Sequence, residues 1–523
     1  MSEDKINSKV ICSAIFSGLL LTGSFPGFAY SGIAWFALFP LLFATRNLSP
    51  RHSFIVGFIA GFSHYTTLIY WLIHTMNDYG HLPIPICVIL LFLLSGYLSL
   101  YIALFTTALS RFRPVNASYL LLIPVLCVAA EYLRSFLFTG FPWELLGHSQ
   151  FNILPVIQLS DITGVYGISF LIALVNAAVF LIGLCLSGKN GHGSLLVSKK
   201  TAAVSAGVTA LCLCLVISYG YIRISKIDYL KSVAKTKKIT VVQGNVDQSL
   251  KWKTSYQLET INKYMGLSFS ALEDKPELIV WPETATPFYF LHKYEKKLST
   301  IVQKGIKKTG SWFLIGSPAG VVEGGSEKHF NSAYLLDPEG NNIGRYDKVH
   351  LVPYGEYVPL RKLFPFVDKL VVGIGDFSSG TKGSTISWNN LKLGVQICFE
   401  IIFPDLARAA VKNGADILIN ITNDAWFGRT SAPYQHLSMT IFRAVENRKA
   451  LVRCANTGIS CFVGPSGRIS SVTSLYSDEF VTHNVPVMKT EPTLYTRFGD
   501  IFAIICTAAA SILVALKYFK RFQ

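Results

Sequence analysis

Three short segments in the second half of the chain place an ionisable side chain at the end of an apolar run. These side chains are Glu283, Lys348 and Cys398. A thiol reacts as its thiolate, and a nearby carboxylate can take its proton as a general base. An ammonium beside a backbone N–H can stabilise an oxyanion. Together the three groups would suffice for acyl transfer through a thioester.

Each of these residues also has an ordinary structural interpretation. A lone glutamate after a strand usually caps or is solvated, and a lone lysine in a loop is solvated. A cysteine that ends an apolar strand is usually a small buried hydrophobe. The catalytic hypothesis therefore depends on all three side chains meeting in space.

Short β-branched runs alternate with amphipathic stretches around these segments. The predicted strands are Lys238–Gln243, Leu278–Trp281, Ser311–Ile315, Ala333–Leu336, Leu393–Ile397, Ile417–Ile421, Leu451–Ala455 and Ser460–Val463. The predicted helices are Leu250–Glu273, His292–Thr309, Pro404–Asn413 and Gln435–Asn447. This alternation predicts a layered α/β domain, a fold class in which strand ends expose reactive side chains.

The sequence carries no motif for a nucleotide or a metal. It has no glycine-rich phosphate-binding loop after a strand, and its His and Cys residues are not clustered at zinc-ligand spacing. We therefore expect no metal ion and no organic cofactor.

Composition shows that the rest of the chain is not an ordinary soluble protein. The 523 residues are 51% hydrophobic and only 15% charged, with a mean hydropathy of +0.42. These values also exclude a disordered chain.

Eight apolar runs approach the roughly 20 residues that a spanning helix needs. They are Val10–Pro26, Ser31–Ala44, Phe54–Thr75, Pro85–Ser110, Ser118–Phe138, Val165–Ser187, Ala202–Ile222 and Phe498–Tyr518.

These runs predict a membrane domain over 1–222, a catalytic domain over 223–496, and an eighth helix with a short tail over 497–523. The net charge of +16 agrees, because basic residues gather in five clusters that eight spans would place on the cytoplasmic side. They are Lys5, Lys9, Arg46, Arg51, Arg111, Arg113, Lys189, Lys199, Lys200, Lys517, Lys520 and Arg521. Both termini are then cytoplasmic, the catalytic domain lies outside, and no nucleic-acid site is needed. A cleaved signal peptide is the alternative for the first run.

The ten cysteines do not suggest a disulfide framework, because seven lie in apolar runs. The other three are Cys398, Cys454 and Cys461, and an odd thiol outside the cytoplasm favours a catalytic role for one of them. Cys454 and Cys461 are predicted on adjacent strands. We expect free, buried thiols there, with a disulfide as the alternative.

Several motifs resemble the bacterial apolipoprotein N-acyltransferases, a membrane-embedded branch of the nitrilase superfamily. The motifs are Trp281-Pro-Glu283-Thr284, Tyr346-Asp-Lys348-Val-His-Leu-Val-Pro-Tyr-Gly-Glu356, Asn423-Asp-Ala-Trp426-Phe-Gly, Gln248-Ser-Leu-Lys-Trp252 and Thr139-Gly-Phe-Pro-Trp143. The resemblance implies a nitrilase-like α-β-β-α sandwich held between the seventh and eighth of eight transmembrane helices.

The resemblance also implies roles for the site residues. Glu283 would be the general base, Lys348 the oxyanion stabiliser and Cys398 the nucleophile. The backbone N–H of Phe399 would be a second oxyanion donor. This position departs from the family, which commonly has Tyr there, so a role for a phenol hydroxyl is in doubt.

Further positions match the family site more loosely. Glu356 and Glu400 would orient Lys348 or assist proton transfer, and Trp252, Asn331 and Trp426 would lie near the substrate.

The implied reaction transfers an acyl chain in two steps. The sn-1 chain of a phospholipid, typically phosphatidylethanolamine, would pass to Cys398 and then to the α-amine of the diacylglyceryl-cysteine of an apolipoprotein. The implied partners are therefore these two lipid substrates and the membrane. The implied location is the bacterial inner membrane, and we expect a monomer.

A further segment bears on access to the site. The apolar stretch Pro359–Gly375, which contains Phe364 and Phe366, is predicted to be a lid that dips into the membrane interface. An amphipathic helix packed on the domain core is the alternative. Phe288–Leu291 could form a second arm.

Two other functions remain open on the sequence. A membrane-anchored nitrilase-type amidase would resolve the thioester with water, although one anchoring helix would suffice for it. A transporter or sensor with an inactive outer domain would need no intact Glu283, Lys348 and Cys398, and would need more intramembrane charge.

Overall fold

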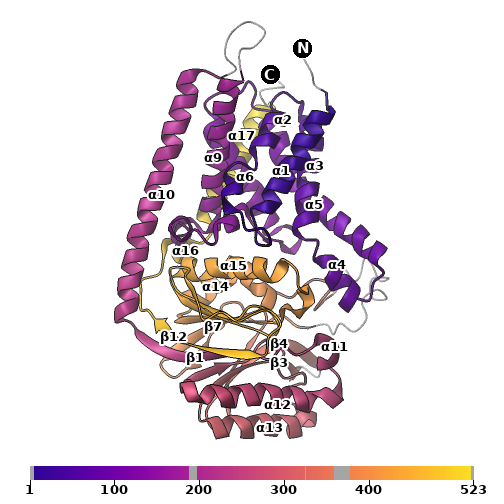
Figure 1. Cartoon of the computed structure of the whole chain (residues 1–523), viewed down its shortest axis with the longest axis vertical. Coiled ribbons are helices and arrows are strands. Elements are labelled where there is room, and N and C mark those ends of the chain that lie inside the picture. The colour runs from indigo at the N-terminus through magenta and orange to yellow at the C-terminus, as the bar shows by residue number, and fades with distance from the viewer. Residues whose placement is uncertain (1–4, 188–196, 324–325, 358–376, 520–523) are drawn as a thin grey trace. The chain divides into compact units, whose positions relative to one another are not determined.

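The computed structural model describes residues 5–187, 197–323, 326–357 and 377–519, and the chain divides into two compact units (Figure 1). Unit 1 comprises Met1–Ile73, Leu82–Ile224 and Phe498–Gln523. Unit 2 comprises His74–His81 and Ser225–Arg497. The segment His74–His81 therefore belongs to unit 2, although the helices on either side of it in sequence belong to unit 1.

Unit 1 is helical. Its principal helices are α1 (Ser8–Gly23), α2 (Phe39–Thr45), α3 (Pro50–Leu68), α5 (Ile84–Ser110), α6 (Tyr119–Arg134), α9 (Val165–Leu186), α10 (Lys199–Val233, which continues into unit 2) and α17 (Ile501–Phe519). Small residues let α3 and α5 pack closely. A Cβ on Gly57 would lie 2.1 Å from Thr106 Oγ1, and one on Gly61 would lie 2.8 Å from Ser99 Cα.

Four of these helices are long and apolar enough to cross a membrane by length and composition. They are α5, α9, α10 and α17. A fifth span results if α3 and the residues Leu72–Tyr79 count together, although a 60° bend separates them. The two N-terminal runs form the shorter helical stretches Ser8–Gly23 and Ser31–Thr45. Within the part of the chain that the structure describes, length and composition thus support four or five spans, and the other predicted spans lack this support.

Unit 2 contains two six-stranded sheets, with the orders β12-β1-β2-β3-β4-β5 and β11-β10-β9-β8-β7-β6. Its strands are β1 (Lys235–Gln243), β2 (Leu278–Val280), β3 (Trp312–Glu323), β4 (Ser326–Leu336), β5 (Asn342–Asp347), β6 (Ile386–Trp388), β7 (Leu391–Ile397), β8 (Ile417–Thr422), β9 (Ala450–Ala455), β10 (Cys461–Val463), β11 (Ile469–Ser470) and β12 (Glu479–Val487). Its main helices are α11 (Gln248–Lys251), α12 (Thr254–Ser270), α13 (Lys296–Thr309), α14 (Pro404–Lys412) and α15 (Ala432–Asn447).

The alternation of apolar residues along the strands explains the layers of unit 2. Along β1, Val241 faces the core between the two sheets, whereas Val242 joins the core beneath α12 and α13. The central strands β7, β8 and β9 are parallel. Strands β8 and β9 are buried along their length, and β7 is buried except at Lys392, as expected for strands covered on both faces. Helices α14 and α15 lie on the other side of the second sheet (Figure 1). The result is an α-β-β-α sandwich.

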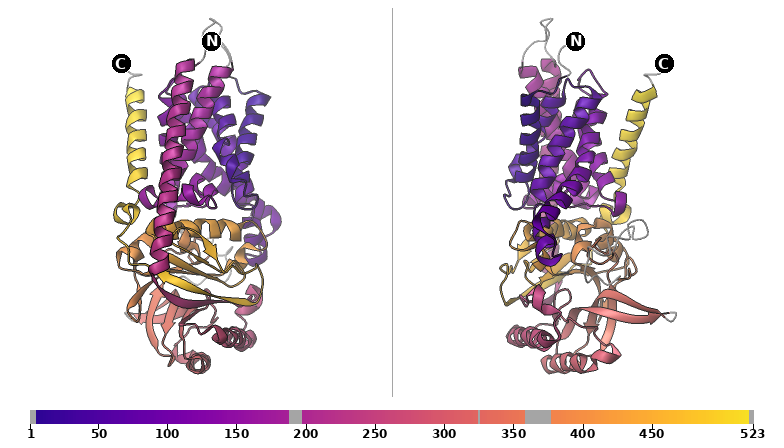
Figure 2. Two further views of the ribbon diagram at one scale, coloured as in Figure 1. Left: turned by 60° about the vertical axis from the view of Figure 1, so that its left-hand side comes forward. Right: turned by 90° about the vertical axis from the view of Figure 1, so that its right-hand side faces the viewer.

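The eight predicted strands are all present, with bounds that shift by a few residues except in one hairpin. There β3 and β4 extend well beyond the predicted runs and form a long arm (Figure 2, right). Four strands, β5, β6, β11 and β12, were not predicted. Half-polar edge strands such as β5 and β12 lack the continuous apolar run on which the prediction relied.

The predicted second arm at Phe288–Leu291 is wrong for its two phenylalanines. Phe288 and Phe290 are both buried and pack in the core of the first sheet with α12 and α13. Their apolar character reflects core packing rather than membrane contact. The predicted lid, with Phe364 and Phe366, lies outside the described residues.

Candidate active site

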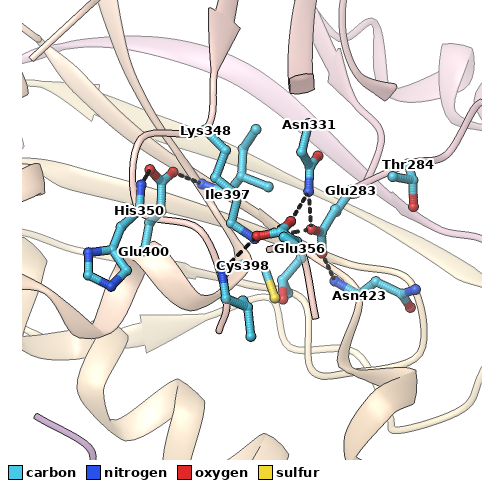
Figure 3. Close-up of polar contacts among 12 residues, drawn as sticks. Glu283, Thr284, Asn331, Lys348, His350, Glu356, Ile397, Cys398, Glu400 and Asn423 are labelled. Atoms are coloured by element: carbon cyan, nitrogen blue, oxygen red, sulfur yellow. Dashed lines mark hydrogen bonds and ion pairs between the residues drawn. The ribbon is translucent and has the colours of Figure 1, made fainter. Parts of the chain in front are cut away.

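The three residues predicted for catalysis gather at the ends of strands in unit 2 (Figure 3). Glu283 lies just beyond β2, Lys348 directly follows β5, and Cys398 directly follows β7. Strands β2 and β5 belong to one sheet and β7 to the other. The site is therefore assembled across the sandwich, from segments far apart in sequence.

Lys348 and two carboxylates form its charged centre. Lys348 Nζ lies 2.9 Å from Glu356 Oε1 and 3.6 Å from Glu283 Oε1. Asn331, from β4, donates through Nδ2 to both of these oxygens at 2.8 Å. Asn331 thus bridges the two carboxylates and fixes the distance between them.

The charge on Lys348 depends on these neighbours. The side chain is almost fully buried, and burial by itself would lower the pKa of its ammonium group. The carboxylates of Glu356 and Glu283 outweigh that cost and raise the pKa above its usual value. An ammonium has three N–H donors, and the hydrogen bond to Glu356 uses one of them, so donors remain for an oxyanion.

The surroundings of Cys398 make its thiol harder to deprotonate than an ordinary cysteine. Burial, followed by the charge of Glu283, raises the pKa of the thiol, although Lys348 acts in the opposite direction. A thiol with a raised pKa needs a base to remove its proton before it can attack. Glu283 is the carboxylate whose charge acts most strongly on this thiol.

The backbone at Cys398 is strained, with a φ of 54° in the left-handed region. Such strain persists only where neighbouring groups hold it. Glu400 is one of these groups, because it accepts hydrogen bonds from the backbone N–H groups of Ile397 at 2.6 Å and Val349 at 2.7 Å. It thereby ties the backbone before Cys398 to the backbone after Lys348. Burial raises the pKa of Glu400 to about 7, although these N–H donors favour its charged form.

A second support for Cys398 was not anticipated from the sequence. His436, on α15, lies with Nε2 3.2 Å from the Cys398 carbonyl oxygen, and Arg453 NH2 lies 3.0 Å from its Nδ1. Burial and Arg453 lower the pKa of His436. Because a carbonyl oxygen only accepts, the contact with Cys398 requires a proton on His436 Nε2, whereas Nδ1 lies near both Arg453 and Asp424 Oδ1, the latter at 3.1 Å. Asp424 accepts from Arg453 at 2.7 Å.

The loop after β8 completes the cage around Glu283. The backbone N–H of Asn423 donates to Glu283 Oε2 at 3.0 Å. The side-chain amide of Asn423 donates to Gln248 Oε1 at 2.6 Å. Both oxygens of Glu283 therefore have fixed donors. The sequence motifs contained Asn423 and Gln248, but nothing in them indicated these contacts.

The three residues expected near the substrate differ in exposure: two are tryptophans at the surface and the third is buried. Trp252 and Trp426 are 49% and 38% exposed, which is unusual for tryptophan in a folded domain. The segment Thr75–Tyr79 supports the Trp426 loop. Thr75 Oγ1 donates to the Trp426 carbonyl at 2.8 Å, and the Tyr79 ring meets the Trp426 ring edge-on at 4.9 Å. Asn331, in contrast, is buried among the carboxylates.

Phe399 packs its ring against Phe403 and His350. Within the described residues, no group of three or more His, Cys, Asp or Glu side chains is arranged to hold a metal ion.

Cys454 and Cys461 are both free thiols, as predicted. Cys461 pairs with Arg453 across the strands, so the two sulfurs are not opposite each other.

The sandwich and its Glu, Lys and Cys side chains define the class of protein: residues 238–495 match the family described as carbon-nitrogen hydrolase. Among solved structures, a carbon-nitrogen hydrolase from Helicobacter pylori G27 covers 51% of this chain and 95% of its own, with 18% identity and a TM-score of 0.39.

Residues 17–178 match a second family, described as apolipoprotein N-acyltransferase N-terminal domain. The apolipoprotein N-acyltransferase of Geobacter metallireducens is 43% identical over 99% of this chain and 97% of its own length. That of Pasteurella multocida is 31% identical over 93% and 91%. The chain belongs to the apolipoprotein N-acyltransferase family and is an acyltransferase.

Proposed function

We propose that this enzyme acylates the N-terminal amine of apolipoproteins through a thioester on Cys398. The observation that carries the proposal is the convergence of Glu283, Lys348 and the Cys398 thiol at one place, with electrostatic interaction among all three. The family membership supplies the acceptor class. We further propose that the acyl donor is a phospholipid, that its sn-1 chain is the one transferred, and that phosphatidylethanolamine is the usual donor.

In the first step Glu283 takes the proton of the Cys398 thiol, and the thiolate attacks the ester carbonyl. The oxyanion that forms is stabilised by Lys348 Nζ and by the backbone N–H of Phe399. Collapse breaks the ester C–O bond, and the leaving alkoxide takes the proton back from Glu283. The products are a lysophospholipid and an acyl-Cys398 thioester.

In the second step the neutral α-amine of the diacylglyceryl-cysteine attacks the thioester carbonyl. Glu283 takes the proton that the attacking amine loses, and the same two donors stabilise the second oxyanion. Collapse expels the Cys398 thiolate, which recovers its proton from Glu283. An amide bond has formed, and the enzyme returns to its resting state.

The supporting carboxylates have separate roles in this proposal. Glu356 holds Lys348 and helps to keep it charged, which its 2.9 Å contact supports. Glu400 positions the loops on either side of the nucleophile and does not touch the reacting atoms. Asn331 keeps Glu283 and Glu356 at a fixed separation.

The lipid chains would contact the exposed rings of Trp252 and Trp426. We retain Phe364 and Phe366 as lid residues in this proposal. Each buried CH₂ is worth about 0.8 kcal/mol, so a catalytic domain held at the membrane avoids extracting whole lipids into water.

We also propose the layout predicted from the sequence. It comprises eight spans, a membrane domain over 1–222, a periplasmic catalytic domain over 223–496, and an eighth helix with its tail over 497–523. The termini are then cytoplasmic, the location is the inner membrane, and the enzyme is a monomer. The distribution of basic residues supports this orientation. Cysteine accessibility to a membrane-impermeant reagent, with single cysteines in each loop, tests it.

The decisive experiment uses the full-length enzyme in detergent with a phospholipid that carries a labelled sn-1 chain. Mass spectrometry should detect one acyl adduct, on the peptide that contains Cys398. Adding a diacylated lipopeptide should then move the label to its α-amine. Absence of the thioester would overturn the mechanism, and release of free fatty acid at an unchanged rate with lipopeptide present would indicate a hydrolase instead.

A further inference from the structure

A buried lysine that has no role in the reaction described above lies against the backbone of the general base. Lys251, the last residue of α11, has no exposed surface. Its Nζ donates to the Glu283 carbonyl oxygen at 3.1 Å and to Thr284 Oγ1 at 2.7 Å. Both acceptors belong to the turn that presents the Glu283 carboxylate to Cys398.

This turn is strained. Thr284 has a φ of 47°, a left-handed conformation that β-branched residues rarely adopt. Strain of this kind costs on the order of 1–3 kcal/mol and persists only where the surroundings hold it. Gly316, on the neighbouring strand β3, shows how closely the turn is packed. A Cβ there would lie 2.3 Å from the Pro282 carbonyl oxygen and 2.7 Å from Glu283 Cα.

A buried ammonium is costly unless it is hydrogen-bonded and paired. Burial lowers the pKa of Lys251 to about 7, although the nearby Glu283 charge acts to raise it. Ordinary core packing at this position would be served by a methionine of similar length. Only a hydrogen-bond donor can link the carbonyl of Glu283 to the hydroxyl of Thr284.

We propose that Lys251 is a positioning residue for the general base: it fastens both sides of the strained Glu283–Thr284 turn and so aims the Glu283 carboxylate at the Cys398 thiol. This inference rests on the proposed function of Glu283. The same short helix also supplies Gln248, whose Oε1 accepts from Asn423, the residue that donates to Glu283 Oε2. Helix α11 therefore fixes the base from two directions.

The test compares Lys251→Met with Lys449→Met. Lys449 is a matched control, because it is also a buried lysine that donates to a backbone carbonyl, that of Met488 at 3.3 Å, and burial lowers its pKa as well. We expect Lys251→Met to slow thioester formation about 10- to 100-fold in kcat, with KM for phospholipid little changed. Lys449→Met should match the wild-type rate, whatever its effect on the melting temperature.

A rescue variant separates positioning from general stability. Glycine adopts a positive φ without strain, so Thr284→Gly should restore Lys251→Met several-fold. Should Lys251→Met fail to fold, Thr284→Ala removes the hydroxyl acceptor while keeping the amine, and it should slow acylation several-fold. Equal rates for Lys251→Met and wild type, or an equal loss in Lys449→Met, would overturn the inference. Absence of a thioester in the wild type would instead overturn the proposed function.

Discussion

Two buried thiols, one within a strand and one just past the end of another strand of the same sheet, show what distinguishes a nucleophile from a core residue. Cys454 on β9 is in register with Ile421 on β8, which is in register with Ile397 on β7, and Cys398 comes one residue later. Burial raises the pKa of both thiols. Neither depth nor acidity therefore separates them.

Their surroundings do separate them. Cys454 lies in a regular strand, and its thiol donates to the carbonyl oxygens of Val280 at 3.2 Å and Val242 at 3.5 Å, both on the facing sheet. Cys398 lies beyond the strand end, at a positive φ, between a base and an ammonium. Both thiols border the apolar core between the sheets, but Cys398, one residue beyond the strand end, also faces charged groups.

The largest expected effect comes from replacing each of these two cysteines by alanine in turn. Cys398→Ala should abolish the acyl-enzyme and reduce N-acylation by about 10⁴-fold or more, because it removes the sulfur that carries the acyl group. Cys454→Ala should keep activity within about threefold and cost about 1 kcal/mol in stability. Intact-mass spectrometry of the labelled enzyme and a thermal melt measure the two results. A thioester that survives in Cys398→Ala would reverse the comparison.

The base that serves Cys398 should have the next largest effect. Glu283→Gln keeps an oxygen acceptor for Asn423 but cannot take the thiol proton, so acylation should fall about 10³-fold. Glu277, just before the same strand, offers the control. Its Oε2 forms an exposed ion pair with Lys237 at 2.5 Å, and Glu277→Gln should change the rate by less than twofold. Single-turnover kinetics of thioester formation distinguish them, and equal losses would argue against Glu283 as the base.

Glu400, near Cys398, should make the stability of the fold depend on pH, an effect that we do not expect from the surroundings of Cys454. The pKa of Glu400 is about 7 in the folded protein, above its ordinary value of 4.5. The folded state then binds more protons than the unfolded state between these values, so stability should fall as pH rises from about 5 to 8, by up to about 3 kcal/mol.

Glu400→Gln removes the titrating group and should flatten this part of the profile. Its amide would face N–H donors, so the variant should be less stable at every pH in this range. Melting temperatures in detergent from pH 5 to pH 8, compared with those of Cys454→Ala, measure the slope. A slope that persists in Glu400→Gln would assign the dependence to another group.

The smallest expected effect concerns the side chain next to the nucleophile. The proposed role of Phe399 uses only its backbone N–H, and its ring packs on Phe403. Phe399→Tyr should therefore change acylation by less than about twofold, provided the added hydroxyl finds a polar partner. A gain well above that, measured with the same phospholipid, would show that a phenol takes part in the reaction.

The sequence predicted secondary structure and burial best where they depend on residues adjacent in the chain. Strands such as Ile417–Thr422 are continuous apolar runs, and their burial follows from composition. The predicted arm at Phe288–Leu291 was wrong for Phe288 and Phe290, because an apolar run after a strand has the same sequence pattern whether its side chains pack inward or outward. Lys251, His436 and Arg453 went unassigned, because a charged residue in a helix or strand gives no sign that tertiary packing will bury it.

The number of predicted membrane spans shows the same limit of sequence-based prediction. Hydropathy responds to apolar composition, and it predicted eight runs. Helix length depends on where the chain breaks, and the break between Leu68 and Leu72 bends one run by 60°. The residues beyond that bend contact the Trp426 loop of unit 2, which no periodicity indicated.

The sequence by itself determined the kinds of groups available, the order of Glu283, Lys348 and Cys398, and the family to which they belong. These are properties of residue type and spacing, which the chain carries in one dimension. Tertiary structure alone decided which carboxylate touches the lysine, which of the buried thiols is placed among charges, and which backbone turns are strained. Those outcomes depend on close contacts between strands of different sheets, and electrostatic and hydrogen-bonding energies are set by such distances.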